Sequence, residues 1–171
     1  MHDSVKNHLT RWYQENKKYI DSVKLADLGS FNINGSTRDI INNLTGFDIL
    51  EGKGVDVVIN PGVIPPNHIG IYGAVTSISS FQFCSDSNLY KKQIIDLLYD
   101  EGLLFLTMCN DRCKGNHSTS PSNYKDFVDQ KRYSKIDLEN IFKDDFEILE
   151  IYETDEHNKE HGDLIIKAKK K

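Results

Sequence analysis

The stretch ADLGSFNINGSTRDI, residues 26–40, decides how this chain can fold. An apolar run ends there on Leu28 and Gly29, with the acid Asp27 just before the turn. Small polar residues follow and lead into a helix-like segment, residues 35–44. A strand that ends on glycine and continues through small residues brings bare backbone close to a ligand.

The composition is that of one soluble globular domain, residues 1–171, with 38% hydrophobic and 27% charged residues. The net charge of −5 disfavours a nucleic-acid partner, because neutralising phosphates requires a basic face. The basic residues 167–171 are interpreted as a solvated terminus. No 18-residue apolar run or signal-peptide pattern occurs, so we expect a cytoplasmic protein with no membrane segment. The sequence does not predict an oligomeric state.

The three cysteines indicate reduced thiols inside a cell rather than a disulfide framework. Cys109, Cys113 and His117 lie close together in sequence, which leaves a zinc site as an alternative. Only these three candidate ligands are near one another, and no second cysteine pair exists, so we predict no metal site.

Strand-like and helix-like segments alternate along the chain. Seven strands are predicted, at residues 23–29, 47–50, 55–60, 70–79, 103–109, 146–152 and 164–168. Helices are predicted at residues 4–20, 35–44, 88–101 and 135–142, with Ser4, Asn34 or Ser36, and Ser134 as N-caps and Gly102 as the glycine that ends the third helix. This pattern predicts an α/β fold with a mostly parallel sheet covered on both faces and a final antiparallel hairpin.

One connection conflicts with this scheme. Parallel strands need a crossover of a dozen or more residues, but Leu50 and Val55, the ends of two predicted strands, are much closer in sequence. Either a helix is reduced to a turn there, or the predicted strand ends are misplaced.

The loop after Gly29 predicts a site for a nucleoside with an anionic group. Ligands of open α/β sheets bind beyond the carboxyl ends of the strands, and unpaired N–H groups in this loop suit an anion. Asp48 lies at the tip of the next strand, where an acid accepts hydrogen bonds from a ribose diol. A dinucleotide would require further glycines, but Phe31 and Asn34 occupy those positions. S-adenosylmethionine is the other ligand that fits.

Several segments resemble the class I S-adenosylmethionine-dependent methyltransferases. DLGSFNINGSTRDI (27–40) and LTGFDILEGKGVDVVI (44–59) are similar to motifs I to III of that family, and YGAVTSISSFQF (72–83) fills the place of motif IV. The resemblance extends to the closing helix and strand, residues 133–153. It implies a Rossmann-like three-layer αβα sandwich, whose mostly parallel seven-stranded sheet has an antiparallel C-terminal strand.

By position, the resemblance also implies site residues for S-adenosylmethionine. Asp27, Gly29, Ser30 and Gly35 would shape the cofactor loop, Asp48 would hold the ribose hydroxyls, Ile49 would pack on adenine, Asn60 would lie near the adenine amine, and Ser79 would flank the methionine part. The chain departs from the family where Phe31 replaces a second glycine, where Asn60 replaces an acid, and where Gln82-Phe83 replaces Glu-His.

The catalytic residues are predicted from loops at the same edge of the sheet. A hydroxyl acceptor requires a general base, for which Asp111 and His117 are the candidates, with His68, before the fourth predicted strand, as a further one. Residues 110–134 are too many for an idle connection, and we expect them to form a substrate lid in which Tyr124 and Phe127 cover the acceptor. A disordered segment is the alternative.

The methyl acceptor is expected to be a small molecule, such as a sugar or another metabolite with a hydroxyl or amine. DNA amino-methyltransferases carry a Pro-Pro motif after the fourth strand, whereas Pro65-Pro66 precedes that strand here. The acidic net charge also disfavours DNA as the acceptor. The alternative function is a non-catalytic module that binds S-adenosylmethionine or S-adenosylhomocysteine.

Overall fold

The computed structural model describes the chain except residues 2, 34, 112–130 and 159–160, and it describes no side chains for residues 155–161. The described residues form a seven-stranded sheet with the order β3-β2-β1-β4-β5-β7-β6. The strands are β1 (Leu25–Leu28), β2 (Leu44–Asp48), β3 (Val57–Val58), β4 (Tyr72–Ile78), β5 (Leu98–Cys109), β6 (Phe146–Asn158) and β7 (His161–Lys170). The helices are α1 (Asp3–Glu15), α2 (Lys17–Ile20), α3 (Ser87–Leu97) and α4 (Lys135–Phe142).

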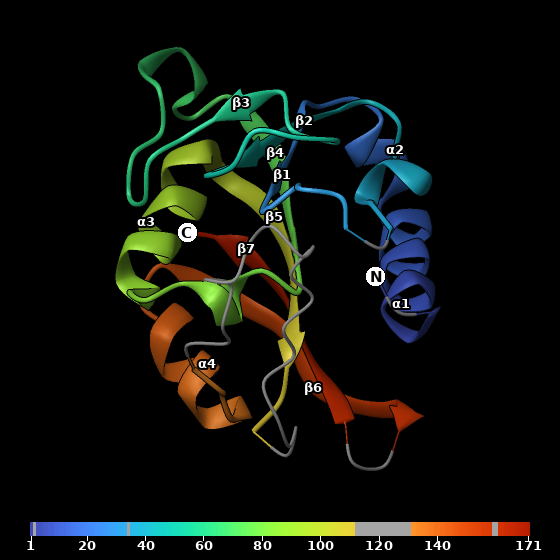
Figure 1. Ribbon diagram of the computed structural model, residues 1–171. Coiled ribbons are helices and arrows are strands. Elements are labelled where there is room, and N and C mark those ends of the chain that lie inside the picture. The colour runs from blue at the N-terminus through green and yellow to red at the C-terminus, as the bar shows by residue number, and fades with distance from the viewer. Residues whose placement is uncertain (2, 34, 112–130, 159–160) are drawn as a thin grey trace.

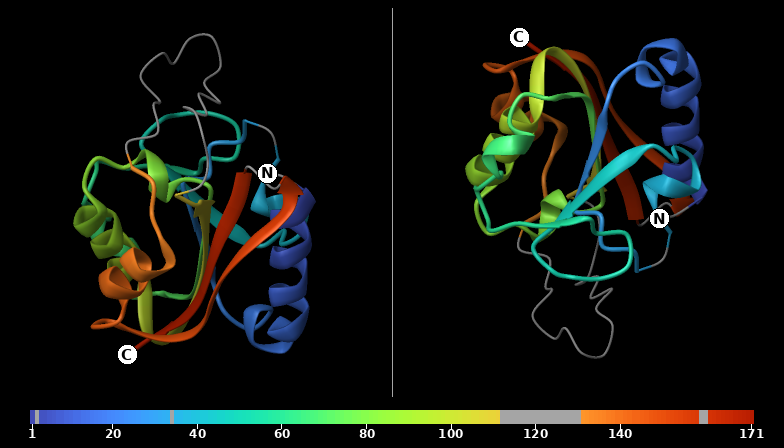
Figure 2. Two further views of the ribbon diagram at one scale, coloured as in Figure 1. Left: turned by 90° about the horizontal axis from the view of Figure 1, so that it is seen from below. Right: turned by 90° about the horizontal axis from the view of Figure 1, so that it is seen from above.

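The sheet confirms the predicted fold class. Strands β1 to β5 pair in parallel, and β7 runs antiparallel to both of its neighbours. Helix α1 covers one face, and α3 and α4 cover the other (Figures 1 and 2). The first face is packed by Leu9 and Trp12 of α1, whose indole lies 5.2 Å from the Phe105 ring between centroids. Ile94 of α3 and Phe142 of α4 are fully buried in the core of the second face.

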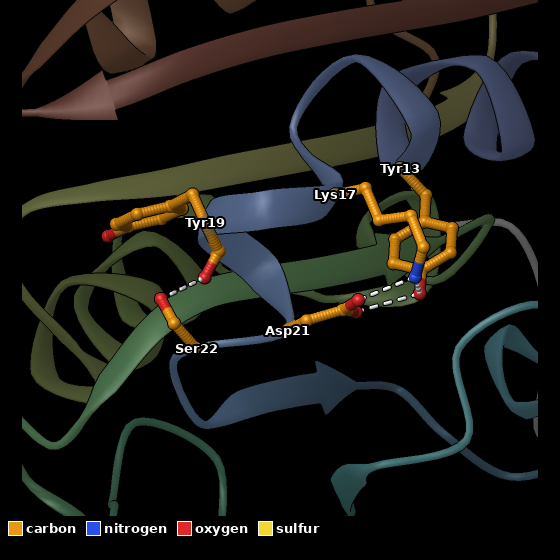
Figure 3. A network of polar contacts seen from close by, with 5 residues as sticks. All are labelled: Tyr13, Lys17, Tyr19, Asp21 and Ser22. Atoms are coloured by element: carbon orange, nitrogen blue, oxygen red, sulfur yellow. Dashed lines mark hydrogen bonds and ion pairs between the residues drawn. The ribbon is translucent and has the colours of Figure 1, made fainter.

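The N-terminal helix of the prediction, residues 4–20, is divided into α1 and α2 at Asn16. Ser4 lies inside the first turn of α1 and is not its N-cap. Polar contacts close α2 before β1 begins (Figure 3). The Tyr13 hydroxyl donates to Asp21 at 2.8 Å, and Ser22 Oγ donates to the carbonyl of Tyr19 at 2.7 Å.

The predicted helix at residues 35–44 is wrong. The structure has only a short 3-10 helix, Thr37–Asp39, and Leu44 already belongs to β2. Ser36 does cap this turn, because its Oγ accepts from the Arg38 N–H while Asp39 accepts from the Ser36 N–H. Ladder pairing of Leu44 with β1 and burial of its side chain under α1 prevail over the helical spacing.

The short connection between β2 and β3 is a helix reduced to a turn. Residues 49–56 carry the chain from Asp48 to Val57 without a helix, and the predicted strand 55–60 shrinks to two paired residues. Asp56 secures the turn, because its carboxylate accepts from the Gly46 N–H at 2.7 Å and its own N–H donates to the Gly46 carbonyl at 2.9 Å.

Gly102 does not end a helix. Helix α3 stops at Leu97, and β5 starts at once, with a register shift before Leu103 where it pairs with β4. Lys170 caps the C-terminus of α3 instead, because its Nζ donates to the carbonyls of Ile95 at 3.2 Å and Leu98 at 2.8 Å.

Residues 167–170 belong to β7, so the interpretation as a solvated terminus is wrong for them, whereas Lys171 follows the strand and is exposed. Lys167 is buried, and its Nζ lies 3.0 Å from a carboxylate oxygen of Glu150. In the described part of the chain, no helix is long and apolar enough to cross a membrane.

Candidate functional site

A cavity of about 170 Å³ opens at the carboxyl ends of β1, β2 and β4. Strand β1 has β2 on one side and β4 on the other, so this edge is the topological switch point of the sheet, where ligands of such folds bind. The strand ends contribute Leu28, Gly29, Asp48 and Ile49, the loop after β3 contributes Ile59, Pro61 and Gly62, and the segment from Ser80 through α3 contributes residues that include Phe83, Leu89, Tyr90 and Gln93.

Gly29 has a conformation and a contact that only glycine satisfies. Its φ is +82°, and a Cβ at this position would lie 1.9 Å from Ser80 Oγ. The N–H groups of Gly29 and Ser30 both donate to the carbonyl of Phe47, at 2.8 and 3.0 Å. The turn after β1 is thereby held against both β2 and the end of β4.

Tyr90 of α3 fixes the floor of the cavity. Its hydroxyl donates to the Leu28 carbonyl at 3.1 Å and lies 2.8 Å from Ser77 Oγ. Burial raises the pKa of the Tyr90 phenol, so this hydroxyl stays neutral. The carbonyl of the residue before Gly29 is therefore already satisfied by the protein.

Asp48 presents a buried carboxylate to the cavity. Its Oδ2 accepts from the Phe31 N–H at 3.0 Å, and its Oδ1 accepts from the Leu50 N–H at 3.1 Å. Burial raises the pKa of Asp48, and the backbone N–H groups of Phe31, Leu50 and Ile49 oppose that rise. An ionised carboxylate has about four acceptor positions, so Asp48 keeps acceptor capacity for a ligand beside its backbone donors. Phe31, which replaces a glycine of the family, serves through its backbone.

Asp27 lies beneath the loop and does not line the cavity. Its side chain is 4% exposed, and Thr76 of β4 donates its Oγ1 hydrogen to Asp27 Oδ1 at 2.7 Å. Burial raises the pKa of Asp27 to about 6. Asp27 thus ties β1 to β4 under the site.

The other predicted cofactor residues are scattered around the cavity. Ile49 lines it with a side chain that is 47% exposed. Ser30 is buried against Gly46, and Gly35 lies beside Met1, so neither is part of the cavity wall.

The two remaining predicted cofactor residues border the cavity without lining it. The side chain of Asn60 is exposed, and its backbone carbonyl accepts from Gln93. Ser79 has a φ of +52° and precedes Ser80, which does line the cavity. The cofactor roles assigned to all these residues stay predictions.

Gln82, which the resemblance aligns with the Glu-His pair, serves as a structural link. Its side chain is 2% exposed, and its Oε1 accepts from the Cys109 N–H at 3.1 Å. This contact ties the 3-10 helix Phe81–Phe83 to the end of β5. The neighbouring Phe83 lines the cavity.

The described ends of the predicted lid, residues 110–134, lie at the carboxyl edge of the sheet. Asn110 forms a bridge with Tyr133, and the Lys131 N–H donates to the Gln82 carbonyl at 3.3 Å. Asp111, a candidate base, is exposed and lies two residues after the end of β5.

The rest of the predicted lid falls outside the described residues, namely His117, Tyr124 and Phe127 together with Cys113. Within the described part of the chain, no group of three or more His, Cys, Asp or Glu side chains could hold a metal ion.

Sequence reasoning missed the contribution of α3, which supplies Leu89, Tyr90 and Gln93 to the cavity. The available signal was Gln93, a polar residue four positions from both Leu89 and Leu97 on the apolar side of the helix. A polar side chain on such a face is either satisfied inside the core or available to a ligand.

No protein-family model and no curated protein matches this sequence. Solved structures match its fold. The [4+2]-cyclase SpnF has a TM-score of 0.68 and 15% identity, covering 95% of this chain and 80% of that chain. The Burkholderia thailandensis 1,6-didemethyltoxoflavin-N1-methyltransferase, with bound 1,6-didemethyltoxoflavin and S-adenosylhomocysteine, has a TM-score of 0.67 and 11% identity, covering 95% and 76%. A SAM-dependent methyltransferase from Aquifex aeolicus has a TM-score of 0.63 and 11% identity, covering 87% and 82%.

Proposed function

We propose that this chain, which has the fold of the class I S-adenosylmethionine-dependent methyltransferases, binds S-adenosylmethionine and transfers its methyl group to a small molecule. The observation that carries the proposal is the position of Asp48. This buried carboxylate is oriented by two backbone N–H groups and borders an apolar cavity at the switch point of the sheet. The solved methyltransferases with the same fold support the proposal.

The residues that line the cavity suit an adenosyl group. Asp48 would accept hydrogen bonds from the two ribose hydroxyls, and the apolar side chains of Ile49 and Leu89 would cover the purine. The amino-acid part of the ligand would lie toward Gly29 and Ser80, where the backbone comes close to the cavity.

The bound cofactor would supply a methyl group on a sulfonium, which needs little further activation. The protein would then hold the acceptor in line with that methyl and exclude water, and orientation of this kind is worth several kcal/mol. Asp111 and His117 are the proposed bases if the acceptor is a hydroxyl. Residues 110–134 would cover the acceptor, since both described ends of this segment lie at the carboxyl edge of the sheet.

The proposed acceptor is a metabolite in the cytoplasm. The net charge of −5 disfavours a nucleic acid as the acceptor, because binding its phosphates requires a basic surface. A methyltransferase with this fold was solved with the small molecule 1,6-didemethyltoxoflavin. The sparse cysteines support a reducing compartment.

The second candidate function is a module that binds the cofactor or its product without transferring methyl. Gln82 favours this alternative, because the position of the Glu-His pair is used here to hold β5. The fold alone does not decide between the two functions, since SpnF is described as a cyclase.

Two measurements test the proposal. Calorimetry with S-adenosylmethionine, S-adenosylhomocysteine and NAD should detect the first two ligands only, and tight NAD binding without a response to S-adenosylhomocysteine would refute it. A screen of cell metabolites with methyl-labelled S-adenosylmethionine should then reveal a labelled acceptor. Binding without label transfer to any metabolite would favour the non-catalytic module.

A further inference from the structure

Gln93 is a buried polar residue in the wall of the cavity. Its side chain is 3% exposed, and it extends from α3 toward the loop after β3. Its Nε2 donates to the Asn60 carbonyl at 3.1 Å and lies 3.5 Å from the Val63 carbonyl.

These two carbonyls determine which way the Gln93 amide points. Carbonyl oxygens only accept hydrogen bonds, so the NH₂ group must face the loop and the Oε1 atom must face away from it. Within the described part of the chain, no donor reaches Gln93 Oε1. Because Gln93 lines the cavity and its amide NH₂ is held by the loop, its Oε1 atom can accept a hydrogen bond from a ligand bound there.

The surroundings of Gln93 suit a flat heterocycle. Ile59 and Leu89 provide apolar surface, and Gly62 packs so closely on Leu89 that a Cβ would lie 2.9 Å from Leu89 Cδ2. Ile49, directly after Asp48, lines the same cavity. Beside this apolar surface, the fixed acceptor Gln93 Oε1 favours a ring that carries a donor, such as an exocyclic amine.

We infer that Gln93 Oε1 accepts a hydrogen bond from the 6-amino group of adenine and so determines which base the site binds. This inference rests on the proposed binding of S-adenosylmethionine. The exposed side chain of Asn60, the residue in the position of the family's acid, is not needed for this recognition. Asn60 contributes through its carbonyl, which orients the Gln93 amide.

The test compares two ligands that differ only at positions 6 and 1 of the base. S-inosylhomocysteine carries an oxygen where S-adenosylhomocysteine carries the amine, and a proton on N1, so its position 6 places an acceptor against Gln93 Oε1. The wild-type protein should bind S-adenosylhomocysteine roughly 5- to 150-fold more tightly by calorimetry. Equal affinities would overturn the inference. If neither ligand binds, the proposed function fails and the role of Gln93 fails with it.

Two variants separate recognition of the base from support of the loop. Gln93→Met removes both the acceptor and the loop contact, so affinity for both ligands should fall and their ratio should approach one. A purely structural role would weaken both equally and preserve the ratio, which would contradict the inference. Asn60→Ala is the matched control and should keep the wild-type ratio, whereas loss of the ratio in this variant would assign the base contact to Asn60. The wild-type comparison needs no variant and decides the matter even if Gln93→Met does not fold.

Discussion

Replacing Gly29 by alanine should damage the site through a single steric conflict. The new Cβ would lie 1.9 Å from Ser80 Oγ and 2.3 Å from Ser80 Cβ, and the residue would have to keep a φ of +82°. The backbone of residue 29 cannot shift freely, because its N–H group donates to the Phe47 carbonyl. The Tyr90 hydroxyl, which would lie 3.2 Å from the new Cβ, restricts movement further.

The expected loss of stability has two parts. A non-glycine residue in the left-handed region costs about 1–2 kcal/mol, and forcing extra atoms into a packed region costs about 1–3 kcal/mol. Gly29→Ala should therefore lower the free energy of unfolding by about 2–5 kcal/mol, measured by urea denaturation. Affinity for S-adenosylhomocysteine should fall as well, since Ser80 must move away from the cavity wall.

A control variant and a double mutant separate the backbone contribution from the steric contribution. Gly70 also has a positive φ, +66°, but no atom lies within 4 Å of its added Cβ, so Gly70→Ala should lose only the backbone contribution of about 1–2 kcal/mol. Combining Gly29→Ala with Ser80→Gly removes the conflicting atoms and should recover about 1–3 kcal/mol relative to additivity. If Gly29→Ala loses no more stability than Gly70→Ala, or if the double mutant is simply additive, the steric argument is refuted.

Three further predictions concern the acids of the site and the predicted lid. Asp48→Ala should lower affinity for S-adenosylhomocysteine roughly 10- to 150-fold by calorimetry, with some loss of stability because two backbone N–H groups lose their acceptor; an unchanged affinity would rule out the ribose contact. For Asp27, the folded pKa of about 6 exceeds the ordinary 3.8, so the native state binds more protons and the free energy of unfolding should fall as pH rises from about 4 to about 6. Asp27→Asn should lack this component, worth roughly 3 kcal/mol at 1.36 kcal/mol per pKa unit, and identical pH profiles in chemical denaturation would contradict the assignment. If a hydroxyl is methylated with His117 as base, His117→Ala should reduce turnover by roughly 10²–10⁴ while ligand affinity measured by calorimetry stays the same; full turnover in the variant would exclude that role.

The sheet could be predicted because its signals are local. Each strand carries its own apolar run, and Gly29 marks the end of β1 without help from the rest of the chain. The helix predicted at residues 35–44 failed because Ile41 and Leu44 fit a helical face equally well. Their burial beneath α1 depends on a helix far away in the sequence, so local spacing could not reveal it.

In the site, too, local features could be predicted from the sequence, and features that depend on distant contacts could not. Asp48 was predicted from its place at a strand tip, which is a property of the sequence around it. The acceptor oxygen of Gln93 depends on where the loop after β3 passes α3, and on two carbonyls that meet its amide there. No spacing rule gives the direction of a side-chain amide, so this feature required the folded structure.

Because β3 has only two paired residues, the local stability of the sheet should differ between its two ends. At one edge, the Ile59 N–H donates to the Asp48 carbonyl at 2.8 Å beside a ladder of only two residues, whereas β5 and β7 pair continuously from Leu103 to Cys109. Amide protons near β3 should therefore exchange with deuterium through local opening, long before those of β5. The cavity is lined both by Asp48, next to the short β3 ladder, and by Gln93 of α3. A ligand that contacts both residues would therefore stabilise the β3 edge of the sheet. Its measured affinity would include the free energy of closing that edge.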